Sequence, residues 1–227
     1  MLSILKEHSI LYVEDEIEIQ ENIAEYLGNF FGVIHLASDG HEALDQYKKH
    51  HPDVLLLDIN LPNLDGLSVA KEIREHDQTI KIIMLTAFTE KEKLLKATEL
   101  KLTRYLIKPV APKDFKETLN LLSSELMNNP SRYLKLSEGL IWDIEQEQLN
   151  LEGELIVLAE KEHRLLKLFI NNKGMPIRYE KIVSTVWDDA LDREISIDSV
   201  KNQVSQLRKK IPSICIKSIY GEGYLFK

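Results

Sequence analysis

The first half of the chain carries polar residues directly after several of its short apolar runs. Glu14 and Asp15 follow the run 10–13, and Asp58 follows the run 54–57. Thr86 follows the run 80–85, and Lys108 follows the run 105–107. Because the carboxyl ends of parallel strands meet at one edge of a sheet, we expect these side chains to converge.

Such a group could carry out phosphoryl chemistry. Crowded carboxylates repel one another unless a cation lies among them, and three carboxylates with some water suit Mg²⁺. Asp58 could then act as a nucleophile and form an acyl phosphate, while the Lys108 ammonium and the Thr86 hydroxyl contact phosphoryl oxygens. Taken singly, Asp15 could equally be a helix cap, Thr86 a structural residue and Lys108 a solvated lysine. The joint pattern favours a phosphoryl site that uses Mg²⁺.

The elements that would position these residues alternate regularly along the chain. The apolar runs at 10–13, 33–37, 54–57, 80–85 and 105–107 predict strands covered on both faces. Spacing and caps predict helices over 17–30, from Asp39, and over 67–74, 90–100 and 112–127. Five strands alternating with five helices predict an α/β fold, a doubly wound parallel sheet of the (βα)5 type.

Four short motifs resemble, in the right order, the signatures of response-regulator receiver domains. They are Val13-Glu-Asp-Glu16, the loop from Asp58 to Gly66, Leu85-Thr-Ala87 and Ile107-Lys-Pro109. The match extends over about residues 9–127, the larger part of the first half.

The resemblance implies roles for the acidic residues. Asp58 would accept a phosphoryl group from a partner sensor histidine kinase. Glu14, Asp15 and the backbone carbonyl of Asn60 would hold Mg²⁺ together with Asp58. The site would therefore switch the protein through phosphorylation, with Mg²⁺ as its cofactor.

The same resemblance implies two conformational features. Tyr105 would be an aromatic switch that turns inward when Thr86 moves toward the phosphoryl group. The Lys108–Pro109 peptide bond would be cis, as bonds before proline can be in sharp turns.

A short polar segment over 128–132, which contains Pro130, is predicted to be a linker. It divides the chain into a receiver domain over 1–127 and a second domain over 133–227. Segments broken by Gly139 and Gly153 predict a small antiparallel sheet over 133–158. The rest of the second domain is predicted to contain helices over 160–171, 179–187 and 196–211, an acidic loop over 188–194 and two short strands within 214–226.

The second domain resembles the winged helix-turn-helix of OmpR/PhoB-like response regulators. The resemblance rests on Val186-Trp187, on Leu207-Arg-Lys-Lys210 and on the segment from Ser218 to Phe226. It implies that the third helix enters the major groove of promoter DNA. Without this resemblance, the polar side of the helix over 196–211 would more simply be interpreted as a face exposed to solvent. The residues expected to contact DNA are Lys201, Asn202, Gln203, Ser205, Gln206, Arg208, Lys209 and Tyr220.

Some positions depart from the pattern of that family. Tyr220 stands where relatives usually carry an arginine at the wing tip, and Glu222 adds a negative charge. Thr103 and Arg104 replace an aspartate pair that relatives use in receiver dimers. The resemblance implies a homodimer on phosphorylation or on DNA, and RNA polymerase as a further partner, but these replacements make the usual dimer less expected.

Bulk composition sets further limits. The formal net charge of -8 argues against a nucleic-acid partner unless basic residues gather locally. The single cysteine, Cys215, excludes an intramolecular disulfide and fits a reducing compartment. No apolar run approaches the roughly 20 residues needed to cross a bilayer. We therefore expect a cytoplasmic protein with no membrane partner.

Two alternatives stay open beside a phosphorylation-dependent transcriptional regulator. An acidic Mg²⁺ site after parallel strands also occurs in phosphatases and phosphotransferases, although the short connections here suggest no cap insertion. The winged helix could also contact protein, given the acidic net charge, Tyr220 and Glu222. The leading interpretation is a regulator that takes part only in its own phosphoryl transfer and slow dephosphorylation, and so is no enzyme in the usual sense.

Overall fold

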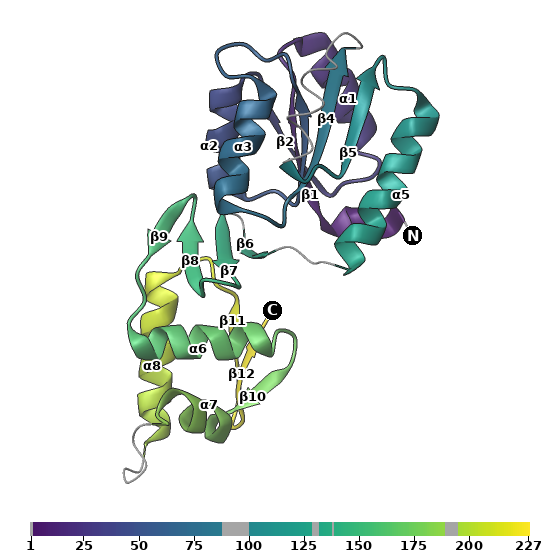
Figure 1. Ribbon diagram of the computed structural model, residues 1–227. Coiled ribbons are helices and arrows are strands. Elements are labelled where there is room, and N and C mark those ends of the chain that lie inside the picture. Colours follow the sequence, from purple (N-terminus) through teal and green to yellow (C-terminus); the bar gives the residue numbers. More distant parts are fainter. Residues whose placement is uncertain (1, 88–99, 129–131, 138, 189–194) are drawn as a thin grey trace. The chain divides into compact units, whose positions relative to one another are not determined.

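The computed structural model describes residues 2–87, 100–128, 132–137, 139–188 and 195–227. Contacts divide the chain into two compact units, Met1–Leu134 and Lys135–Lys227 (Figure 1). The predicted helix over 90–100, the linker over 128–132 and the acidic loop over 188–194 lie largely outside the described residues. The exact domain limits therefore stay predictions.

The first unit is built on a five-stranded parallel sheet of order β2-β1-β3-β4-β5. Its strands are β1 (Ser9–Val13), β2 (Val33–Ala37), β3 (Val54–Asp58), β4 (Lys81–Ala87) and β5 (Arg104–Lys108). The described helices are α1 (Ile17–Leu27), α2 (Gly40–His50), α3 (Gly66–His76) and α5 (Pro112–Asn128), and a short 3-10 helix, η1 (Leu2–Glu7), precedes β1. The predicted α/β sheet is confirmed.

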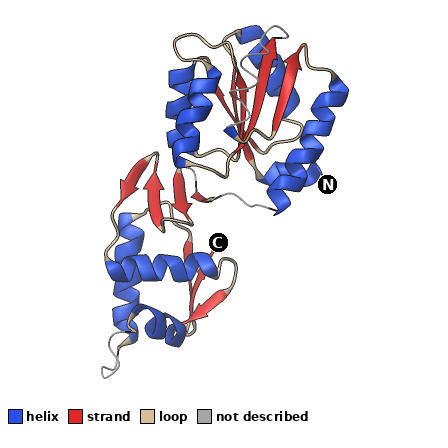
Figure 2. Cartoon of the chain, viewed as in Figure 1, coloured by secondary structure: helices blue, strands red, loops and turns tan. Residues whose placement is uncertain are grey.

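Helices lie on both sides of this sheet (Figure 2). The central strands β1, β3 and β4 are buried almost throughout, which explains their continuous apolar runs, while the edge strands β2 and β5 are partly exposed. Side chains alternate between the two faces along a strand. Leu11 and Val13 of β1 therefore join the core under α2 and α3, while Ile10 and Tyr12 join the core under α1 and α5. Each aliphatic side chain buried in this way stabilises the fold by roughly 1.5–3 kcal/mol.

The second unit combines two small sheets with helices. A sheet of order β6-β7-β8-β9 comes first, and a sheet of order β10-β12-β11 closes the unit. The strands are β6 (Tyr133–Ser137), β7 (Leu140–Asp143), β8 (Gln148–Leu151), β9 (Glu154–Ile156), β10 (Pro176–Arg178), β11 (Ile216–Ile219) and β12 (Gly223–Phe226). The helices are α6 (Glu160–Asn171), α7 (Tyr179–Val186) and α8 (Ile197–Lys210). Strand β10 was not predicted, because three residues that begin with proline give no strand pattern.

Helix α8 presents an apolar face to the core of this unit. Val200, Val204 and Leu207 are fully buried, as the helical spacing predicts. Ser196 caps the helix, since its hydroxyl accepts a hydrogen bond from the Ser199 backbone N–H. The polar face of α8 is thereby held away from the core. No helix among the described residues is long and apolar enough to cross a membrane.

Candidate functional site

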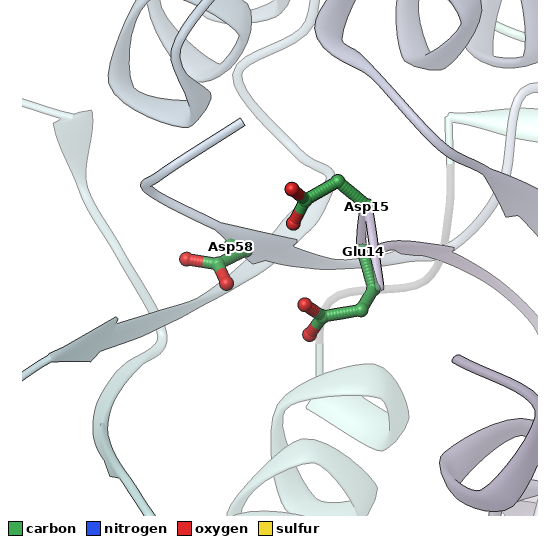
Figure 3. Close-up of side chains that lie close together, drawn as sticks. All are labelled: Glu14, Asp15 and Asp58. Atoms are coloured by element: carbon green, nitrogen blue, oxygen red, sulfur yellow. The ribbon is translucent and has the colours of Figure 1, made fainter. Parts of the chain in front are cut away.

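Three carboxylates meet at the carboxyl edge of the parallel sheet. Asp58 is the last residue of β3, and Glu14 and Asp15 directly follow β1 (Figure 3). Strands β1 and β3 pair in parallel with Val13 opposite Leu57, so the residues that follow emerge side by side. One oxygen from each carboxylate lies within 4.8 Å of the other two. The predicted convergence of these residues is thus present.

Lys108 joins this cluster from the end of β5. Its ammonium donates to Glu14 Oε2 at 2.7 Å and also bonds to Asp58 Oδ2. Burial disfavours the charged amine, but the hydrogen bonds to Asp58 and Glu14 and their negative charges outweigh it, so the pKa of Lys108 is raised. The lysine is therefore held charged between two carboxylates.

Further hydrogen bonds fix the orientation of the carboxylates. The Tyr12 hydroxyl donates to Glu14 Oε2 at 3.0 Å, and the Asn60 backbone N–H donates to Asp58 Oδ1 at 2.9 Å. Burial, and then the charge of Glu14, raise the pKa of the Tyr12 phenol, so it stays a donor. Glu14 Oε1 is buried and has no hydrogen-bond partner among the residues that the structure describes. That orphaned oxygen, beside two further carboxylates, is what a hard divalent cation would satisfy.

The loop after β3 depends on a glycine. Gly66 opens α3, and a Cβ placed on it would lie 2.0 Å from the carbonyl oxygen of Asp58. Its backbone N–H donates to the Ile59 carbonyl at 3.0 Å, which closes the loop. Asp65 caps α3 by accepting from the Leu67 and Ser68 backbones. The close approach of Gly66 therefore holds the backbone that carries Asp58, a role that only its type and place in the loop could have signalled.

Thr86 and Tyr105 lie near the site without a bond to Asp58. Thr86 is buried at the end of β4, and its hydroxyl donates to the Ala87 carbonyl at 3.0 Å. Tyr105 packs against the core under α2 and α3, and its buried hydroxyl has no partner in the described part of the chain. The switch motion predicted for the pair is not tested by these positions. The Lys108–Pro109 bond is cis, as predicted.

The polar face of α8 and the turn between β11 and β12 contain the residues predicted to bind DNA. Tyr220 is fully exposed at that turn. Lys201 pairs with Asp198 at 2.9 Å. Arg208 differs from its neighbours, because it donates to the Ile216 carbonyl at 2.6 Å. The remaining side chains are exposed or half-buried: Asn202, Gln203, Ser205, Gln206 and Lys209.

Two family models match the chain. The response regulator receiver domain matches residues 10–120, and the C-terminal domain of transcriptional regulatory proteins matches residues 153–226. The probable transcriptional regulator ycf27 of Cyanophora paradoxa is 32% identical over 236 residues, which cover 98% of each chain. The chain belongs to the OmpR/PhoB family of response regulators.

Other similar proteins are also response regulators or transcriptional regulatory proteins. The transcriptional regulatory protein CssR of Bacillus subtilis is 30% identical over 222 residues, 96% of this chain and 97% of its own. Among solved structures, the REC domain of AraT, a response regulator from Geobacillus stearothermophilus, matches 55% of this chain and 98% of its own, with 30% identity and a TM-score of 0.50.

This response regulator is a two-component transcriptional regulator that binds DNA through its C-terminal domain. Its two domains imply a kinase and DNA as partners. The family consists of regulators rather than classical enzymes, which removes the phosphatase and phosphotransferase alternative. Membership also favours DNA over protein as the ligand of the winged helix.

Proposed function

We propose that Asp58 is the phosphoacceptor of this response regulator and that a sensor histidine kinase supplies the phosphoryl group. The convergence of Glu14, Asp15 and Asp58 with the Lys108 ammonium carries this proposal. Asp58 is 5% exposed, and hydrogen bonds from Asn60 and Lys108 hold its carboxylate in place. Its Oδ1 is oriented by the Asn60 N–H, which leaves Oδ2, now bound to Lys108, as the candidate nucleophile.

The donor set fits Mg²⁺. Glu14, Asp15, Asp58 and the Asn60 carbonyl offer oxygen atoms alone, and Glu14 Oε1 lacks any other partner. When bound, Mg²⁺ would neutralise charge on the incoming phosphoryl group. Lys108 would move from the Asp58 carboxylate to a phosphoryl oxygen.

Phosphorylation would bias a two-state receiver. The Thr86 hydroxyl would leave the Ala87 carbonyl for a phosphoryl oxygen, and Tyr105 would report that movement from β5. Tyr105 is half-buried, and its hydroxyl has no partner among the described residues, so the surroundings of its ring rather than a lost hydrogen bond would set the energy difference between the two states.

The output would be promoter binding in the cytoplasm, by a homodimer that contacts RNA polymerase. Helix α8 would lie in the major groove, with amide and hydroxyl groups for base edges and lysines for phosphates. The predicted contacts are Lys201, Asn202, Gln203, Ser205, Gln206, Arg208, Lys209 and, from the wing, Tyr220. The contacts of Arg208 within the protein modify this assignment, as argued below.

Labelling by a small acyl phosphate donor in the presence of Mg²⁺ tests the acceptor. The full chain is expected to gain one phosphoryl group by intact mass, and Asp58→Asn none. Asp45→Asn, which changes an exposed aspartate of α2, serves as the matched control and should label normally. Phosphorylation of Asp58→Asn at the wild-type rate would overturn the assignment.

A further inference from the structure

Arg208 lies near the end of α8 and reaches the adjacent strand β11. Its Nη2 donates to the carbonyl oxygen of Ile216 at 2.6 Å and lies 3.5 Å from the Ser218 hydroxyl oxygen. A hydrogen bond from a charged guanidinium to a carbonyl is among the stronger bonds that a side chain makes. The contact therefore ties the polar face of α8 to the first strand of the wing.

The same guanidinium also reaches the second strand of the wing. Its central carbon lies 5.7 Å from the centre of the Tyr224 ring in β12, within cation–π range. Tyr224 is 3% exposed, and its ring packs edge-on against Phe169 of α6 and Tyr179 of α7. Arg208 thus connects α8 with both strands of the wing, at a ring that is itself fixed in the core.

Among the other cations of α8, Lys210 pairs with Glu162 of α6 at 2.7 Å, but none is bonded to the wing among the described residues. Lys209 is exposed and, among the described residues, forms no hydrogen bond or ion pair. Lys201 pairs with Asp198 within its own helix. Since Lys209 offers the same charge one residue away, it separates the effect of charge from the effect of the contacts that Arg208 makes.

The turn that Arg208 would orient carries the most exposed aromatic residue of the unit. Strands β11 and β12 pair from Ile216 opposite Phe226 to Ile219 opposite Gly223, and Tyr220 follows directly. Two backbone bonds fix the turn itself: the Glu222 N–H donates to the Ile219 carbonyl, and the Tyr179 N–H donates to the Glu222 carbonyl. Arg208 contacts β11 and β12, the two strands that lead into this turn.

We propose that Arg208 is a positioning residue, which sets the distance and angle between α8 and the wing tip at Tyr220 so that both engage one DNA duplex. This inference rests on DNA binding by α8 and the wing. Arg208 acts chiefly through β11 and β12, and reading of bases is left to the amide and hydroxyl side chains on the same face.

A double-mutant cycle separates positioning from direct contact. The full chain and its variants Arg208→Ala, Tyr220→Ala and the double variant are titrated against a DNA fragment that the wild type binds, at one salt concentration. If Arg208 acts through the wing, each single change weakens binding about tenfold and the double variant loses little more than either. If the two losses multiply, Arg208 contacts DNA independently and the proposal is wrong.

Lys209→Ala provides the control cycle. Its loss is expected to multiply with that of Tyr220→Ala, because a lysine that contacts phosphate acts independently of the wing. If no variant and no wild-type protein binds any DNA, the proposed function itself fails, which is a different result from a multiplicative cycle. If the Tyr220→Ala affinity equals that of the wild type, the wing tip makes no contribution and the positioning role is overturned.

Two measurements guard against a variant that fails to fold. Arg208→Lys keeps the positive charge, but an ammonium cannot stack on the Tyr224 ring and donate to the Ile216 carbonyl at the same time, as the planar guanidinium does. The Arg208→Lys variant should therefore bind DNA about as weakly as Arg208→Ala. Amide hydrogen exchange without DNA should be faster at residues 216–219 in Arg208→Lys and unchanged in Lys209→Ala. Wild-type affinity of Arg208→Lys, or unchanged exchange in the wing, would rule the proposal out.

Discussion

The ammonium of Lys108 donates to Glu14 Oε2 at 2.7 Å, although the two residues are 94 positions apart in the chain. The bond crosses the carboxyl edge of the sheet from the end of β5 to the end of β1, past β3 and β4. Lys108 therefore neutralises part of the charge that would attract a divalent cation.

Replacing Lys108 by methionine should tighten Mg²⁺ binding and slow phosphorylation. Loss of a positive charge within about 4 Å of the carboxylates is expected to raise Mg²⁺ affinity roughly tenfold. Phosphorylation should slow because the variant has no ammonium group to contact the oxygens of the incoming phosphoryl group. Isothermal titration and mass-resolved labelling measure the two effects. Lys113→Met, an exposed lysine of α5, is the control; equal Mg²⁺ affinity in both variants would contradict the neutralising role of Lys108.

Replacing Gly66 by alanine should distort the loop that holds Asp58. The added Cβ would lie 2.0 Å from the backbone carbonyl oxygen of Asp58, which cannot move aside as a flexible side chain would, so the loop has to shift. We expect a loss of about 1–3 kcal/mol in the free energy of unfolding together with slower labelling, measured by urea denaturation and intact mass. Gly28→Ala, whose nearest Cβ contact is 3.2 Å, should cost distinctly less.

The hydroxyl groups of Tyr105 and Tyr12 should have different effects on the free energy of unfolding. The Tyr105 hydroxyl is buried and unpartnered within the described residues, so Tyr105→Phe is expected to leave the free energy of unfolding unchanged or raise it by up to about 1 kcal/mol. The Tyr12 hydroxyl bonds to Glu14, so Tyr12→Phe should lower that free energy by about 1 kcal/mol. Chemical denaturation of both variants under one condition gives the comparison. A larger loss in Tyr105→Phe would mean that its hydroxyl is bonded in solution.

The ion pair between Glu162 of α6 and Lys210 of α8, at 2.7 Å, should make the second unit sensitive to acid. Burial alone would raise the pKa of Glu162, but the hydrogen bond from Lys210 and that from the Ala159 backbone lower it below the ordinary 4.5. The stabilisation is therefore complete above pH 4.5 and is lost as the pH falls through the lowered pKa.

Glu162→Gln should remove that acid-sensitive part. At pH 7 the variant is expected to be less stable by about 1 kcal/mol, and the difference from wild type should shrink as the pH falls below the ordinary pKa. Thermal unfolding between pH 7 and pH 3, followed by the fluorescence of Trp142 and Trp187, measures this. A difference that stays constant over that range would show that the ion pair is not its source.

The sequence could predict those parts of the fold that follow from the spacing of apolar residues along the chain. Asp58, Glu14 and Lys108 could be brought together in advance, because runs of apolar residues predict parallel strands and strand ends share an edge. The Tyr12–Glu14 bond was not predicted, since Tyr12 read only as one residue of an apolar run. The alternation of side chains along a strand places Tyr12 on the opposite face of β1 from Val13. It does not predict which group the Tyr12 hydroxyl contacts.

Arg208 shows the same limit in the second unit. Helical spacing assigned it correctly to the polar face of α8, yet spacing within a helix carries no information about a strand that follows it. Its bond to Ile216 depends on the tertiary position of β11, and the third strand of that sheet, β10, has too short a pattern to be seen. The sequence therefore defines which face of α8 is polar. The structure adds that Lys201 on this face is paired with Asp198 and that Arg208 is bonded to the wing.

The bond between Lys108 at the end of β5 and Glu14 after β1 has a consequence for synthesis of the protein. A chain leaving the ribosome presents Glu14, Asp15 and Asp58 well before Lys108 has been added, and domains generally fold as units. Until that lysine arrives, the acidic trio lacks the positive charge of Lys108, and only the hydrogen bonds from Tyr12 and Asn60 and any external cation offset the repulsion between the carboxylates. We therefore expect the complete phosphoryl site to form only after β5, the last strand of the sheet, has been synthesised.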